Sequence, residues 1–410
     1  MPENSSSGID SPRAWLIVVA AFIGSFVAFG ITYTFGVFLK PMRETFGASQ
    51  SLMSLLFSCL TGLSFFLAPV TGDIADRAGP RVVVGAGAVL MGAGLIFTAR
   101  THSFAMLFLT YGAGVGAAIA CIYVPSIAAV GEWFKIHRDV ALGIAISGIG
   151  CGTLVYAPLA AILIKRFGWR STFEIFGWSS AVLLLICAAL LSQPPVLNVM
   201  RKKRTNVMQK VRTAEFVWVY ISMMFAALAT YITFVFLPAY AADVGVSHIA
   251  GAALIGYIGA SSVVGRLGLN ALAPRFGLLT MYKISFLVLL AGYVVWLVAH
   301  SYISLVIFSL VMGVGYGGIA AMSPAVAAAV FGIEGLGELL GILFTSFGVA
   351  CVVGPPLAGV LVDRTHDYKW PVVLALGGAV GGMITVLMVR RRGEQQEAGI
   401  GAVEGVTGSE

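Results

Sequence analysis

The sequence predicts an all-α membrane protein with twelve transmembrane helices arranged as two pseudo-symmetric six-helix bundles. The first reason is composition: 59% of the 410 residues are apolar and 10% are charged, whereas a soluble domain is roughly half apolar and a quarter charged. The second is that charge-free runs of about 20 residues, enough to cross a bilayer core, recur from residue 14 to residue 389. The third is an internal repeat, in which motifs of the first half recur 198 residues later.

Twelve helices are expected where these apolar runs lie. Their expected bounds are 14–39, 51–72, 82–100, 104–130, 140–164, 172–192, 216–241, 249–272, 281–299, 302–325, 338–362 and 371–389. An even number of spans places both termini on one side of the membrane. That side receives 16 of the 25 Lys and Arg residues and the other side receives 8, while Arg266 falls inside a span. By the positive-inside rule, the termini are expected in the cytoplasm, with the protein in the inner or plasma membrane.

A basic segment between the sixth and seventh apolar runs divides the chain. It follows a Pro-Pro break and contains four consecutive basic residues at 201–204, as expected for a solvated loop that fixes topology, with contact to anionic lipid as a second interpretation. The expected organisation is a cytoplasmic leader at 1–13, an N-terminal bundle at 14–192, a basic cytoplasmic linker at 193–215, a C-terminal bundle at 216–392 and a flexible cytoplasmic tail at 393–410.

Three separate motifs carry the internal repeat. The corresponding segments are 141–160 with 339–358, 72–79 with 270–277 and, one residue further apart, 114–125 with 313–324. Recurrence at a fixed offset indicates two related halves. Parallel six-helix repeats are the plan of the major facilitator fold, in which substrate binds between the halves near the bilayer midplane.

The connection between the second and third expected helices carries a charged motif. Its residues are Gly72, Asp73, Asp76, Arg77, Gly79 and Arg81. The motif resembles the cytoplasmic loop motif of the major facilitator superfamily, and we expect its charges to pair across adjacent helix ends as the two halves rock. A purely topogenic role is the alternative. The second copy keeps Arg275 and Gly277 but lacks both acids, so a symmetric charge lock is not expected.

Several function classes are not expected from this composition. The net charge of +7 does not indicate a nucleic-acid partner, because the basic residues lie in short gaps between apolar runs. The five cysteines lie in apolar runs without CxxC spacing or neighbouring histidines, so neither a metal site nor another cofactor is expected. Glycine-rich runs follow no strand and indicate closely packed helices rather than a nucleotide site. With no buried Ser/His/Asp cluster, an enzyme is not expected.

Segments along most of the chain resemble the monocarboxylate transporter family of the major facilitator superfamily. They are residues 131–138 leading into 141–150, residues 35–40 before 46–48, and residues 354–359. The pattern is also similar to that of the oxalate/formate antiporters. The resemblance implies a monomeric, proton-linked symporter of lactate- or pyruvate-like carboxylates that works by alternating access in the lipid bilayer. Carboxylate/carboxylate exchange is the alternative, and a multidrug or other facilitator is third.

Arg266 is the strongest candidate for a substrate-binding residue. An arginine inside a span costs roughly 2.5–3.5 kcal/mol on insertion scales and marks a functional site by default. Its planar guanidinium is suited to a carboxylate. An arginine that snorkels from a position near the helix end is the alternative, but both related families place a substrate-binding arginine at the matching position.

Further candidates rest on the resemblance and on position. Tyr123 matches a pocket tyrosine of the oxalate/formate antiporters, with a packing tyrosine as the alternative. Lys40 looks like a functional lysine of the monocarboxylate transporters, which attracts anions and moves protons, although an interfacial lysine is equally expected. Glu174 is the second proton-coupling candidate, and Asp243 and His248 are titratable groups at helix ends. The other substrate-binding candidates, on helices expected to line the cavity, are Tyr33, Tyr231, Tyr316 and Ser323.

Two departures from the related families sharpen the prediction. Phe347 stands where the oxalate/formate antiporters place a lysine, which leaves one deep cation and an apolar wall, so a monocarboxylate is expected rather than a compact dianion. Ser262 stands where the proton-coupled family usually places an aspartate, on the same helical face as Arg266. That proton relay is missing, so the coupling proton has to use Lys40, Glu174 or the substrate acid itself.

Overall fold

The computed structural model describes residues 11–134, 136–192, 207–332 and 336–389, and helices are the only regular elements in them. The helices of the first half are α1 (Pro12–Tyr33), α2 (Phe35–Phe46), α3 (Gln50–Phe66), α4 (Ala68–Ala78), α5 (Pro80–Arg100), α6 (Phe104–Leu107), η1 (Phe108–Val115), α7 (Gly116–Trp133) and α8 (Arg138–Leu190). Those of the second half are α9 (Val207–Val211), α10 (Ala214–Asp243), α11 (His248–Val264), η2 (Gly265–Leu269), α12 (Asn270–Phe276), α13 (Leu278–Leu297), α14 (Tyr302–Phe331), α15 (Leu336–Thr365) and α16 (Lys369–Leu387).

Twelve membrane spans are present in the described residues. Ten helices are long and apolar enough to cross a membrane, and the bent pair α3 and α4 makes eleven. The twelfth comes from α8, because Gly168 inside it has a φ of 79° and a ψ of 165°, a conformation open to glycine without steric cost. The chain turns at Gly168, so α8 contains two successive spans, as the sequence predicts. Most of the expected basic linker, residues 193–206, lies outside the described residues.

Two spans differ from their expected shape. The first is broken at Thr34 and continues as α2 to Phe46, beyond the expected end at residue 39. The second bends by 42° between α3 and α4 and remains helical to Ala78, beyond the expected end at residue 72. The charged motif therefore lies mostly on a helix and not in a loop. An ion pair between Asp73 and Arg77, one helical turn apart at 2.8 Å, supports the longer helix.

The backbone itself repeats with the same period as the sequence. Positive φ angles occur at Gly47 and Gly245, at Gly79 and Gly277, and at Gly168 and His366, and each pair is separated by 198 residues. Ser49 and Ser247, separated by the same interval, each cap the helix that follows. Corresponding turns are thus built in the same way in the two halves, which is the structural counterpart of the sequence repeat.

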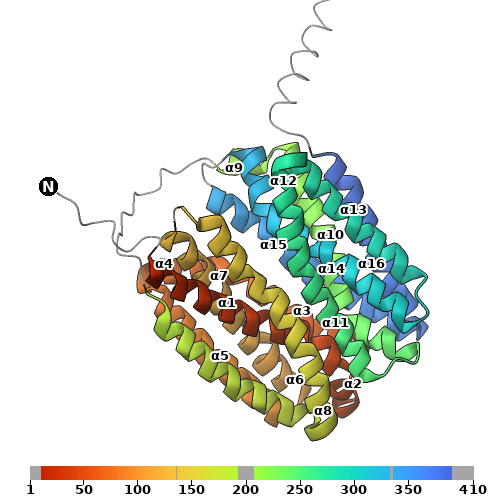
Figure 1. The fold of residues 1–410 in the computed structure, drawn as a ribbon. Coiled ribbons are helices and arrows are strands. Elements are labelled where there is room, and N and C mark those ends of the chain that lie inside the picture. The colour runs from red at the N-terminus through yellow and green to blue at the C-terminus, as the bar shows by residue number, and fades with distance from the viewer. Residues whose placement is uncertain (1–10, 135, 193–206, 333–335, 390–410) are drawn as a thin grey trace, which may run out of the picture.

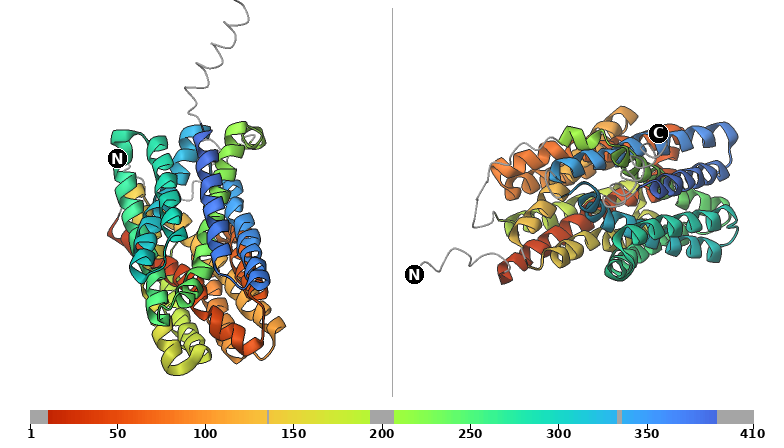
Figure 2. Two further views of the ribbon diagram at one scale, coloured as in Figure 1. Left: turned by 90° about the vertical axis from the view of Figure 1, so that its right-hand side faces the viewer. Right: turned by 90° about the horizontal axis from the view of Figure 1, so that it is seen from above.

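The two halves form separate bundles that meet mainly along three helix pairs (Figure 1). The pairs are α3 with α15, α8 with α11, and α2 with α10. The first described helix begins and the last one ends on the same side, where α4 and α12 lie apart (Figure 1). The bundles converge towards the opposite side, which we call the far side. Figure 2 gives the same arrangement from two other directions.

Candidate functional site

Arg266 lies at the interface between the bundles and is only 4% exposed. It belongs to η2, a short π-helical turn, and such turns are frequent at functional sites. Its Nη1 donates a hydrogen bond of 2.7 Å to the carbonyl oxygen of Ile146 on α8, so it bridges the two halves. Its Nε and Nη2 atoms are buried and have no hydrogen-bond partner among the described residues. A buried polar group without a hydrogen-bond partner costs free energy. The guanidinium is therefore available to donate hydrogen bonds to a bound acceptor.

The two unpartnered atoms form one complete edge of the guanidinium. The N–H groups of Nε and Nη2 point in the same direction, which is the geometry that donates to both oxygens of a carboxylate. None of the three ion pairs in the described part of the chain includes Arg266. The site therefore offers one unneutralised charge with a free bidentate edge.

Aromatic residues from both halves surround this charge. The guanidinium carbon lies 5.7 Å from the ring centre of Tyr316, within the range of a cation–π contact. The Tyr316 hydroxyl lies 3.2 Å from that of Tyr33 on α1, and the Tyr33 ring stacks on Phe234 at 4.0 Å. Tyr123 packs edge-on against Phe29 at 4.8 Å. The structure thus brings Tyr33 and Tyr316, two of the predicted tyrosines, together across the interface near Arg266.

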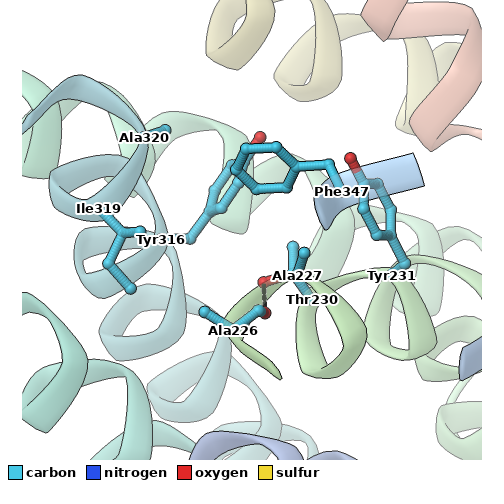
Figure 3. Close-up of a pocket in the computed structure, with 8 residues that line it drawn as sticks. All are labelled: Ala226, Ala227, Thr230, Tyr231, Tyr316, Ile319, Ala320 and Phe347. Carbon is cyan, nitrogen blue, oxygen red and sulfur yellow. Dashed lines mark hydrogen bonds between the residues drawn. The ribbon is translucent and has the colours of Figure 1, made fainter. Parts of the chain in front are cut away.

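A small cavity lies on the C-terminal side of this cluster (Figure 3). Its volume is about 20 Å³, enough for roughly one water molecule. The lining residues are Ala226, Ala227, Thr230, Tyr231, Tyr316, Ile319, Ala320 and Phe347. The Phe347 ring also stacks near Phe65 of α3 at 5.8 Å, so an aromatic wall joins the bundles. Three of the predicted residues, Tyr231, Tyr316 and Phe347, therefore line one mostly apolar cavity.

Other predicted residues lie elsewhere. Ser323 faces α13, where its hydroxyl lies 3.3 Å from that of Tyr282. Glu174 pairs with Arg100 at 3.1 Å on the exposed surface. Lys40 is exposed and lies 4.0 Å from Glu44. The structure does not group any of these three with Arg266.

Lys40 lines a different cavity, on the far side of the molecule. This cavity has a volume of about 250 Å³ and also contacts Arg43, Asp243, His248 and Tyr368. The two titratable groups expected at solvated helix ends, Asp243 and His248, are thus brought together with Lys40 in an outer vestibule.

The charged motif does not form the contact expected of it. Its one ion pair in the described residues is Asp73 with Arg77 inside α4, and both side chains are well exposed. Arg81 is exposed at the start of α5. Gly79, with a φ of 90°, makes the tight turn between the two helices. In this conformation the motif acts as a helix end and turn.

Sequence reasoning missed part of the site. Phe29, Phe65 and Phe234 complete the aromatic lining, and the Ile146 carbonyl accepts from Arg266. Phe29 could have been found, since it lies one turn from Tyr33 on the same helix face. A backbone carbonyl on another helix leaves no signal in the sequence.

Comparison with known proteins identifies the family. The sequence pattern of the Major Facilitator Superfamily matches residues 21–299 and 270–407. The chain belongs to the Major Facilitator Superfamily. The solved structure of a bacterial homologue of the human lysosomal transporter Spinster, in an inward-facing and occupied conformation, superposes with a TM-score of 0.72 over 93% of this chain and 95% of that one. At 16% identity, this likeness shows the fold alone.

Similar sequences within the Major Facilitator Superfamily include monocarboxylate transporters. Human monocarboxylate transporter 12 is 26% identical over 402 residues, covering 89% of this chain and 78% of the relative. Rat monocarboxylate transporter 3 is 29% identical over 394 residues, covering 92% and 79%. Membership of the superfamily makes this chain a multi-pass membrane transporter and not an enzyme.

Proposed function

We propose that the protein is a secondary active transporter of small monocarboxylates that works by alternating access, with its termini in the cytoplasm. The observation that carries this proposal is the free Nε and Nη2 edge of Arg266, buried between the two bundles. A carboxylate bound there would satisfy both atoms, and it would contact both halves of the carrier. The similarity to monocarboxylate transporters supports the same substrate class.

The surroundings of Arg266 favour a small substrate with one charge. Arg266 is the one buried cation among the residues that the structure describes, and one guanidinium balances one carboxylate. The neighbouring cavity is lined by alanines, Ile319 and the Phe347 ring (Figure 3), which suits the short alkyl tail of a lactate- or pyruvate-like acid. The hydroxyls of Tyr33 and Tyr316 can donate to a hydroxyl or keto oxygen of such a substrate. Tyr123 is a further donor in this proposal.

We infer that the coupling proton is not on the carboxylate while Arg266 holds it, and that its carrier is Lys40, Glu174 or the substrate acid before it ionises at the site. Ser262 donates to the backbone carbonyl of Gly259 at 2.7 Å and does not titrate in the accessible pH range. Glu174 and Lys40 lie in exposed ion pairs away from Arg266. Inward movement of a bare anion costs about 2.3 kcal/mol per charge for each 100 mV of negative interior, so entry with a proton is favoured.

Carboxylate exchange is the second candidate, and one observation favours it. With no acid paired to Arg266 in the described residues, an empty carrier has to reorient with a buried unneutralised charge, which is costly. A carrier that returns with a second carboxylate avoids that cost.

Uptake into proteoliposomes tests the proposal. Labelled lactate, pyruvate, formate and oxalate are offered to vesicles that are either empty or preloaded with unlabelled carboxylate. The proposal expects saturable uptake of lactate or pyruvate above that of protein-free vesicles. Uptake of none of the four acids would refute carboxylate transport, and uptake only into preloaded vesicles would establish exchange.

A further inference from the structure

On the far side, Asp363 joins the two bundles. This residue lies near the end of α15, in the C-terminal half. Its carboxylate accepts hydrogen bonds from the backbone N–H groups of Gln50 at 2.8 Å and Ser51 at 2.9 Å. Those are the first two residues of α3, in the N-terminal half, and their N–H groups have no partner within the helix. The positive end of the α3 dipole also favours the carboxylate.

Two further contacts hold the same point. The Gln50 side-chain amide donates to the Tyr368 hydroxyl, and Gln50 is only 3% exposed. Burial raises the pKa of Tyr368 above its usual value, with Arg43 acting in the opposite direction, so the hydroxyl stays protonated. Gly359 of α15 lies so close to α3 that a Cβ atom there would be 2.7 Å from the Ser51 Cα. The end of α15 is thus seated on the start of α3.

Helix capping alone does not account for Asp363. The side chain of Ser49 already caps α3 by accepting from the Leu52 N–H at 3.2 Å. Asp363 comes instead from the other bundle, and its bonds break whenever the far side opens. These bonds therefore form only when the carrier is closed on the far side, and α3 and α15 do not need them in order to form.

The other interface carries the opposite charge at the corresponding place. Asp363 corresponds, 198 residues earlier, to Lys165 on α8, and the start of α3 corresponds to the start of α11. Lys165 is exposed, and a cation is unfavourable at a helix N-terminus. The contact is therefore present at one of the two related interfaces only.

We propose that Asp363 is the latch of the far-side gate, and that its two bonds to the start of α3 hold the carrier closed on the far side. In a transporter that alternates between two states, the strength of this latch sets the fraction of molecules open to that side. The proposal concerns the empty carrier and does not depend on which substrate it transports.

Two native cysteines report on the gate. Cys351 is fully buried on α15 at the latched interface, where its carbonyl oxygen accepts a bond from Ser58 of α3. Cys187 is 1% exposed and packs within the N-terminal bundle, away from the other half. Opening of the gate exposes Cys351 alone, whereas unfolding exposes both. The remaining cysteines, Cys59, Cys121 and Cys151, are replaced by alanine in the background for the experiment.

The experiment measures the rate at which maleimide labels each reporter in purified, substrate-free protein, resolved by peptide mass spectrometry. Asp363→Asn is expected to raise the Cys351 rate about tenfold or more, because a charge-assisted pair of hydrogen bonds is weakened, while the Cys187 rate stays unchanged. Asp363→Glu is expected to lie between wild type and Asp363→Asn. Lys165→Gln, the matched control on the other interface, is expected to label like wild type.

Two results would contradict the proposal that Asp363 holds the far side closed. An unchanged Cys351 rate in Asp363→Asn would mean that these bonds do not hold the gate. Equal acceleration of Cys351 and Cys187 would mean that Asp363 stabilises the fold as a whole.

Discussion

The two long interfaces between the bundles, α3 with α15 and α8 with α11, are related by the internal repeat and differ in chemistry. Polar and aromatic side chains dominate the first, with the Asp363 contact at one end and the Phe65–Phe347 stack deeper in. Close backbone approach occurs at Gly359, beside the Asp363 contact, in the first interface, but it occurs in the middle of the second, where a Cβ on Gly150 would lie 2.6 Å from the Gly259 carbonyl oxygen. The Arg266 bond to α8 lies on this second interface.

This difference separates two tasks. Side-chain bonds at α3 and α15 can break and form again as the carrier changes state, which suits a gate. Backbone contact at α8 and α11 leaves no room to shear, which suits a pivot that keeps Arg266 in place. The repeat therefore supplies two similar helix pairs, and their side chains assign gating to one pair and binding of the substrate carboxylate to the other.

The largest expected effect comes from removing the charge at the second interface. Arg266→Ala should abolish carboxylate uptake into proteoliposomes, since the only buried cation among the described residues is lost. Arg266→Lys should restore little of it, because a point ammonium lacks the planar two-bond edge. Near-normal uptake by correctly inserted Arg266→Ala protein would show that Arg266 is a structural residue.

Adding a methyl group where α8 and α11 approach closely should have the next largest effect on carboxylate uptake. Gly150→Ala is expected to reduce uptake about tenfold, because the methyl group meets backbone and a shift costs about 1–3 kcal/mol. The matched control is Gly348→Ala, at the corresponding position of α15, where the nearest neighbours of the added atom are side-chain atoms, the Phe66 ring at 3.1 Å and Phe65 Cβ at 3.5 Å. Uptake by that variant should stay within about twofold of wild type. Equal losses in both variants would remove the distinction between pivot and gate.

A smaller effect is expected at the aromatic wall. Phe347→Ala should enlarge the cavity and favour acids with one or two more methylene groups relative to lactate, by about fourfold for each buried group. Competition for labelled lactate uptake measures this preference. In the wild type, lactate or pyruvate should compete better than oxalate at equal concentration, and the reverse order would contradict a site with one cation.

A proton gradient should change the rate of carboxylate uptake without changing which residues bind the carboxylate. An inward pH gradient is expected to stimulate uptake into otherwise empty vesicles, and dissipating it with a protonophore should remove the stimulation. Ser262 supplies no titrating group beside Arg266, so replacing Ser262 with alanine should leave the stimulation by the gradient unchanged. Uptake that ignores the gradient and requires preloaded carboxylate would establish exchange.

Much of the fold follows from the sequence. Apolar runs predict the membrane spans, loop charges predict their orientation, and a repeat at one offset predicts two related halves. The turn at Gly168 was predictable for the same reason. The helical course of Gly72 to Ala78 was not, since charges near a span end resemble a loop until the Asp73–Arg77 pair is seen on one helix face.

The candidate site was predicted less completely. Arg266 stands out because a charge in a span is costly, and Phe347 and Tyr316 follow from family position and helix number. The contacts of Arg266 with Ile146 and of Asp363 with the start of α3 are made by backbone atoms of another bundle, so no residue type marks them. Lys40 and Glu174 carry charge near helix ends, and only the structure shows that exposed partners hold them there.

The most direct test of the account is binding of lactate to the purified carrier by isothermal titration calorimetry, compared with lactamide, which has the same shape without the charge. We expect wild-type protein to bind lactate and not lactamide, and Arg266→Ala protein to bind neither. Lactate binding to Arg266→Ala protein with unchanged affinity would contradict the claim that the free edge of Arg266 holds the substrate carboxylate.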